Sequence, residues 1–320
     1  MTAILTISIL IFSQVANALA SPHSKLNTIV QVDDSPILQM KAKEESKWSL
    51  WFENPEGTRH SKFMKMHGKL MHMIVVSSDL EHFAHIHPSF NAETKVFDIH
   101  INASTQDPDN FALPETVSRA GTYFAFTEVM PMPMDDKMPM KMDRFSVSAV
   151  APLDAPIMLD SKPRKPLTLK EKSGGQTLYF DEDGQQGELG DFYKLHFSYE
   201  NFEFCGKWLP KFYFEIYTMG PQGYELSSGW KQWLEMGGHS ILISQYGEDL
   251  QAKVFHHLHA FLPISEPGKF IFPFDHHKPQ LQAGVYKIWG QFKNGDKILT
   301  LPVLFEYIFP SQIKPNFKGC

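Results

Sequence analysis

The feature that most constrains the fold of this chain is an internal duplication. Residues 68–87 and 237–259 share one order of features: a lone histidine in an apolar, strand-like run, a turn that contains Asp-Leu, and a His-x-His tripeptide. An Ala-Gly-x-Tyr sequence follows each segment, at 120–123 and at 283–286. A repeated order of features indicates a duplicated domain.

Short alternating runs separated by Gly, Pro, Asn and Asp fill both halves, and no long stretch has helical periodicity. The sequence therefore predicts an all-β protein with two tandem immunoglobulin-like antiparallel β-sandwich domains. The expected strands are 48–52, 69–76, 83–87, 96–101, 121–129 and 145–150, and then 192–199, 211–217, 239–245, 255–261, 269–274, 284–293 and 297–307.

The N-terminus has the pattern of a secretory signal peptide. A short apolar run is followed by Ala18-Leu19-Ala20, an A-x-A cleavage pattern, and the mature chain is expected to be periplasmic or secreted. No later segment reaches the roughly 18 apolar residues of a membrane span. The expected organisation is a signal peptide (1–20), an extended lead-in (21–46), domain 1 (47–150), a linker (151–188), domain 2 (189–310) and a tail (311–320).

Charge and cysteine content narrow the function classes. The formal net charge is −6, with no basic run interleaved with aromatic residues, which argues against a nucleic-acid partner. The chain has two cysteines, Cys205 and Cys320. In an oxidising compartment they either pair and tie the tail to the second domain or remain two thiols.

Pairing geometry brings the histidines of each segment together. A hairpin folded about Asp79-Leu80 places His72 opposite His87, and the corresponding midpoint in the second copy falls at Asp249. The two histidines of a His-x-His tripeptide share one face of a strand, beside a cross-strand neighbour about 5 Å away. Three imidazoles in this arrangement can converge on one transition-metal ion. The expected ligands are His72, His85, His87, His239, His257 and His259.

A methionine-rich stretch biases the choice of metal toward copper, with zinc or another transition metal as the alternative. Thioethers are soft ligands that favour Cu(I). Interleaved prolines are expected to prevent the stretch from being a core strand or a helix interior, which leaves a flexible, exposed tract. A disordered loop with chance methionines is the competing interpretation. The candidate ligands are Met130, Met132, Met134, Met138, Met140 and Met142.

Other residues leave alternatives open. Met71 and Met73 alternate with His72 and are expected in the core. Further histidines are either outer ligands or surface residues. These are His67, His82, His256, His276 and His277.

The segments GKLMHMIVVSSDLEHFAHIHP, GGHSILISQYGEDLQAKVFHHLHAFLP and AGVYKIWGQFKNGDKILTLPVLF resemble the bacterial YtkA-like domains, which are related to FixH-type proteins. The resemblance implies an exported immunoglobulin-like sandwich associated with copper or heavy-metal handling. It covers most of residues 47–150 and 190–308. The second hairpin departs from the pattern by its longer turn, and Ala260 stands where the first has Pro88.

Three function classes follow. The leading one is an extracytoplasmic copper chaperone, scavenger or sensor with an envelope metal-transport protein or a cuproenzyme as partner. The second is a bicupin-like metal enzyme, although Glu93 and Glu266 lie too far after the His-x-His pairs for the cupin pattern. The third is an interaction module without metal, which would use an aromatic run such as residues 230–234.

Overall fold

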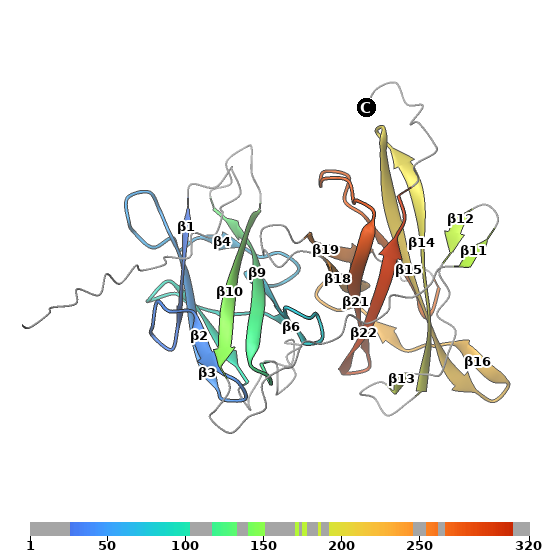
Figure 1. Cartoon of the computed structure of the whole chain (residues 1–320), viewed down its shortest axis with the longest axis horizontal. Coiled ribbons are helices and arrows are strands. Elements are labelled where there is room, and N and C mark those ends of the chain that lie inside the picture. The colour runs from blue at the N-terminus through green and yellow to red at the C-terminus, as the bar shows by residue number, and fades with distance from the viewer. Residues whose placement is uncertain are drawn as a thin grey trace, which may run out of the picture. The chain divides into compact units, whose positions relative to one another are not determined.

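The computed structural model describes residues 26–102, 117–132, 140–150, 192–245, 254–261 and 266–309, together with three short strands, β11 (Lys170–Lys172), β12 (Gly175–Thr177) and β13 (Gln185–Gln186). Every regular element in these ranges is a strand, as Figure 1 shows. The chain divides into two compact units, Met1–Asp160 and Ser161–Cys320. Each is built from antiparallel sheets, which confirms the predicted all-β class and the two sandwiches.

The first unit has two sheets. One contains, in spatial order, β1 (Asn27–Val32), β3 (Ser46–Glu53), β8 (Val96–Ile101) and β7 (Ser89–Asn91). The other contains β2 (Gln39–Lys41), β10 (Lys141–Val150), β9 (Gly121–Pro131), β5 (Met71–Ser77) and β6 (Phe83–Ile86), with β4 (Phe63–Met64) also on β9. Pairing is antiparallel except between β2 and β10.

Alternation along the strands builds the first core. Trp48, Leu50 and Phe52 point inward from β3 and are buried with Met71 and Met73 of β5. Fully burying one such side chain contributes roughly 1.5–3 kcal/mol. The prediction that these two methionines belong to the core is confirmed.

The second unit repeats this plan. One sheet contains β13, β14 (Phe192–Phe204), β15 (Lys207–Gly220) and β16 (Gly223–Leu226), with β20 (Lys269–Pro273) also on β15. The other contains β17 (Trp230–Lys231), β21 (Gly284–Asn294), β18 (Gly238–Ser244) and β19 (Phe255–Ala260), with β22 (Lys297–Tyr307) also on β21. Phenylalanines dominate the core between them, including Phe197, Phe212, Phe214, Phe272 and Phe305.

The two units correspond strand by strand. Strands β5, β6, β9 and β10 of the first match β18, β19, β21 and β22 of the second in order and pairing. The hydroxyl of Tyr123 donates to the carbonyl oxygen of Arg119 (3.1 Å), and that of Tyr286 donates to Gln282 (2.9 Å). A tyrosine bonded to the backbone four residues upstream resembles the tyrosine corner of immunoglobulin-like sandwiches. The Ala-Gly-x-Tyr repeat marks this corner.

The first sandwich begins earlier than the predicted boundary at Lys47. Strand β1 pairs with β3 along its whole length, and β2 pairs with β10, so residues expected as an extended lead-in belong to both sheets. Both are outermost strands in their sheets. Strand β2 has only three residues, and the sequence NTIVQV of β1 does not alternate, so strand periodicity did not reveal them. Likewise, strands β11, β12 and β13 lie within the stretch 151–188 that we expected to be a linker.

Other expectations concern the termini and the cysteines. The signal peptide and the C-terminal tail lie outside the described residues. Cys205, in the turn between β14 and β15, is disulfide-bonded. Cys320 lies outside the described residues. None of the described residues forms a helix long and apolar enough to cross a bilayer.

Candidate metal centres

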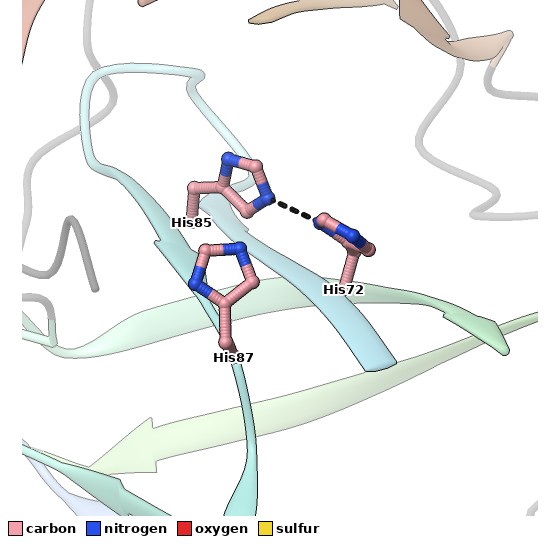
Figure 2. Close-up of side chains that lie close together, drawn as sticks. All are labelled: His72, His85 and His87. Carbon is pink, nitrogen blue, oxygen red and sulfur yellow. Dashed lines mark hydrogen bonds between the residues drawn. The ribbon is translucent and has the colours of Figure 1, made fainter. Parts of the chain in front are cut away.

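Three histidines meet at one end of the β5–β6 hairpin. The register pairs Met73 with Ile86 and Ile74 with His85, which continues to His72 opposite His87, as predicted. All three histidines therefore share one face of the sheet, and their side chains are buried. Figure 2 shows the rings gathered together, with His72 facing the other two.

Distances within the trio suit one ion. Each of His72, His85 and His87 offers a nitrogen within 4.8 Å of the other two. The Nδ1 of His72 lies 3.2 Å from the Nε2 of His85, the dashed line in Figure 2. Two nitrogens each about 2.0 Å from a tetrahedral ion are about 3.3 Å apart. The spacing therefore matches two neighbouring positions of a metal's coordination shell.

The other nitrogen of His72 is fixed by the backbone. Its Nε2 lies 3.0 Å from the carbonyl oxygen of Met66. A carbonyl only accepts, so Nε2 carries the proton and Nδ1 carries the lone pair. Metal-binding histidines characteristically donate their second N–H to such a carbonyl or carboxylate, which fixes tautomer and ring orientation.

A tight turn places that carbonyl. Met66 and Lys69 exchange two backbone hydrogen bonds, of 2.8 and 3.0 Å, around His67 and Gly68. Both turn residues have positive φ, 48° and 79°, the signature of a type I′ turn. The conformation suits Gly68, and it directs the Met66 carbonyl toward His72.

Burial also keeps His72 ready to bind a metal. Desolvation lowers the pKa of His72 below its ordinary value of 6.5. The hydrogen bond to Met66 and the charge of Glu128 act in the opposite direction, and the positive charges of His67 and Lys69 reinforce the lowering. The imidazole is consequently neutral at pH 7, the form that ligates metals.

The hairpin turn fixes the register. The Ser77 hydroxyl donates to the Asp79 carboxylate and accepts from the backbone N–H groups of Glu81 (3.1 Å) and His82 (2.9 Å). Leu80 has a φ of 61°. Ser and Asp side chains that bond to nearby backbone are a common means of stabilising turns. This network holds the register that places His85 opposite Ile74 and His87 opposite His72.

Apolar side chains on β5, β6 and β9 occupy the rows next to the trio on the same face of the sheet. Ile74 and Phe126 are level with His85, and Val76, Phe83 and Phe124 form the next row. These five are buried, and none belongs to the first core cluster. Dry, apolar surroundings lower the local dielectric and thereby tune the charge preference of a bound metal.

The second copy reproduces the arrangement. His239 pairs directly with His259, and Ile241 pairs with His257, as the midpoint at Asp249 predicted. One nitrogen from each of the three histidines lies within 4.8 Å of the others. His259 is half-buried and the other two are buried. The turn residues 246–253 lie outside the described part of the chain.

A turn with positive φ precedes this trio as well. Trp233 and Met236 exchange backbone hydrogen bonds of 2.9 and 3.0 Å around Leu234 and Glu235. The indole ring of Trp233 packs edge-on against His239, with centroids 4.9 Å apart. Trp233 belongs to the aromatic run that we considered as an interaction surface, but its side chain is buried against the histidine.

Sequence reasoning missed a pair of residues beside the histidines. Glu128 on β9 lies directly opposite His72, and Gln291 on β21 lies directly opposite His239. Both side chains are buried. Each lies five residues after the tyrosine of its Ala-Gly-x-Tyr sequence, so aligning the two copies on that sequence would have found them.

Among the contacts that the structure describes, none joins a methionine of the stretch 130–142 to the first histidine trio. Contrary to the expectation from the prolines, Met130 and Pro131 end strand β9, and Met142 lies within β10. The described methionines of the stretch, which also include Met132 and Met140, are half-buried rather than exposed. Proline is tolerated at the end of a strand, and β4 pairs there. Met134 and Met138 lie outside the described residues.

The remaining histidines are dispersed. The ring of His67 lies 6.2 Å from that of His72, and His256 packs on Phe274 at 4.5 Å. His82 contacts the hydroxyl of Ser118. His276 and His277 form a separate exposed group with Asp275, whose carboxylate accepts from the His277 backbone N–H.

Comparisons with known proteins give a family match within the first unit and a weak structural likeness that extends over both. A family model described as a domain of unknown function (DUF8832) matches residues 27–140, beginning where β1 begins. No curated protein matches the chain. A crystal structure of a DUF4785 family protein from Legionella pneumophila subsp. pneumophila matches with 10% identity and a TM-score of 0.26, covering 89% of this chain and 58% of that one. The chain thus spans 58% of that protein's length, and we draw no argument from this likeness. The first unit is similar to a domain of unknown function.

Proposed function

We propose that this protein binds transition-metal ions, most favourably copper, with one ion at each histidine trio. The observation that carries the proposal is that both copies of the duplicated hairpin bring three imidazole nitrogens within 4.8 Å of one another. Two trios at equivalent positions of a duplicated hairpin are difficult to explain by packing alone, because moving polar imidazoles out of water costs free energy that apolar side chains would not.

Several features support a role in holding metal rather than in catalysis. The ligands lie on paired strands, which hold them rigidly. The backbone carbonyl of Met66 accepts the Nε2–H of His72 and so orients its ring with Nδ1 free of a proton. Imidazole suits copper, zinc and nickel, and copper is favoured because the methionine stretch that ends β9 offers soft thioethers for capturing Cu(I).

The cellular setting is part of the same proposal. An N-terminal signal peptide would deliver the protein to the periplasm or the exterior, where a copper chaperone or scavenger would exchange ions with an envelope transporter or a cuproenzyme. The resemblance to YtkA-like domains favours this setting. Below about pH 6, protonation of the histidines should release the metal.

Competitive titration tests the proposal. The purified protein is titrated with Cu(I) and with Cu(II) against a chelator of known affinity, alongside His85→Asn, His257→Asn and the control His100→Asn. His100 is exposed and lies outside both trios. Each trio variant should lose tight binding at its own trio, and the control should match the wild type. Negligible affinity in the wild type would end the proposal.

A further inference from the structure

The two trios lie in equivalent cross-sheet rows that differ in chemistry. In the first unit, one row runs from Met142 on β10 through Glu128 on β9 to His72 on β5. In the second, it runs from Thr300 on β22 through Gln291 to His239. Directly paired residues point to the same face, with Cβ atoms about 5 Å apart. Each trio therefore has one polar neighbour on the adjacent strand, a carboxylate in one copy and an amide in the other.

The amide of the second copy has a defined partner. The Nε2 of Gln291 donates to the Thr300 hydroxyl at 3.2 Å, on the side of β21 away from His239. Gln291 is fully buried. The second trio consequently has a neutral and fixed neighbour.

The carboxylate of the first copy acts on the trio through its charge. Glu128 is 4% exposed and lies directly opposite His72 across the β9–β5 pair. Burial weakens screening, so its field reaches the nearby nitrogens with little loss. Coulomb attraction to a divalent ion is twice that to a monovalent ion at the same distance.

We propose that Glu128 and Gln291 set the charge preference of the two trios. Glu128 makes the first trio selective for a divalent ion, Cu(II) or Zn(II), whereas Gln291 leaves the second trio suited to Cu(I). This inference rests on the proposed metal-binding function. The protein would then hold the two oxidation states of copper, or copper and zinc, at separate sites.

Variants that keep only one trio, used as backgrounds, isolate the metal preference of that trio. His257→Asn/His259→Asn leaves the first trio, and His85→Asn/His87→Asn leaves the second. In the first background, Glu128→Gln should lower Zn(II) affinity by on the order of 10- to 100-fold, as changes to the partners of metal ligands do. It should lower Cu(I) affinity by only about 3- to 10-fold, because the attraction to a monovalent ion is half as strong. In the second background, Gln291→Glu should raise Zn(II) affinity by on the order of 10-fold.

A matched control removes the same charge elsewhere. Glu93→Gln changes an exposed residue in the turn between β7 and β8 and should leave both affinities unchanged. An equal fall in Zn(II) and Cu(I) affinity in Glu128→Gln would mean a structural role and overturn the inference. A ratio of Zn(II) affinity to Cu(I) affinity that stays unchanged in both Glu128→Gln and Gln291→Glu would overturn it as well. If Glu128→Gln does not fold, the Gln291→Glu arm decides. Absence of binding in the wild type would instead defeat the proposed function itself.

Discussion

The Nε2 of His72 donates a 3.0 Å hydrogen bond to the carbonyl oxygen of Met66, and this single contact links a backbone turn to the chemistry of the first trio. The carbonyl is positioned by the turn at His67 and Gly68. Turn geometry should therefore control both the tautomer of His72 and its affinity for metal.

Gly68→Val tests that link. Gly68 has a φ of 79°, and a Cβ there would meet no atom within 4 Å, so the cost is backbone strain of about 1–2 kcal/mol. We expect weaker metal binding at the first trio as well as a lower melting temperature. Gly57→Val is the matched control, because Gly57 has a φ of 77° and equally open space. It should lose similar stability and bind metal normally. Equal metal affinities in the two variants would contradict the link.

The stability of the metal-free protein should fall as the pH decreases below about 6.5. Burial lowers the pKa of His72 in the folded protein, so the unfolded chain binds more protons between that lowered value and 6.5. Stability is complete above this window and is lost progressively within it. Thermal melts between about pH 7.5 and about pH 5 measure the effect. His72→Gln should flatten the profile, and His100→Gln should not. An unchanged profile in His72→Gln would contradict this assignment.

A buried ion pair stabilises the strand that carries Met142. Lys141 and Asp143 lie 2.9 Å apart with fully buried side chains, and the Thr28 hydroxyl donates to Asp143 at 2.6 Å. Asp143→Asn leaves the Lys141 cation unpaired and should destabilise the unit by about 3–5 kcal/mol. Glu44→Gln, which breaks an exposed pair with Lys41, should cost less than about 1 kcal/mol. Chemical denaturation distinguishes the two, and equal losses would contradict the prediction.

Methionine substitutions test whether thioethers belong to the first coordination shell. Met142 lies beyond Glu128 from His72, two strand spacings or about 9.6 Å away. Replacing Met130, Met132, Met140 and Met142 together by leucine should change the equilibrium affinity of the first trio for metal less than about 3-fold, whereas the protein as a whole should take up Cu(I) more slowly. Stopped-flow uptake and competitive titration measure the two quantities. A large loss of affinity would place a thioether among the ligands.

The histidine trios were predictable because hairpin pairing is local. A hairpin midpoint at Asp79-Leu80 or at Asp249 fixes which residues lie opposite each other across the two strands. Strand alternation then determines which side chains share a face. Glu128 and Gln291 come from strands about 50 residues away, whose register no local pattern sets. Aligning the two copies on the Ala-Gly-x-Tyr sequence of the tyrosine corner could have predicted that Glu128 and Gln291 occupy equivalent positions.

The missed strands have a different cause. Strand β1 is outermost in its sheet, and its sequence NTIVQV places Ile29 and Val30 side by side, which breaks the period-2 pattern of a half-buried strand. In the methionine stretch, we took the prolines as evidence against a strand. Pro131 is the last residue of β9 and pairs with Phe63 of β4, and the ladder hydrogen bond beside it comes from the Met132 N–H to the Lys62 carbonyl (2.8 Å), so no N–H is needed from Pro131.

Metal stoichiometry tests the central claim most directly. The full-length protein is loaded with copper, freed of loosely bound ions by dialysis against a weak chelator, and analysed for metal. The account predicts one ion per trio: two per wild-type chain, one in His85→Asn/His87→Asn or in His257→Asn/His259→Asn, and none when all four are changed. Retention of copper by a folded quadruple variant at the wild-type level would contradict it.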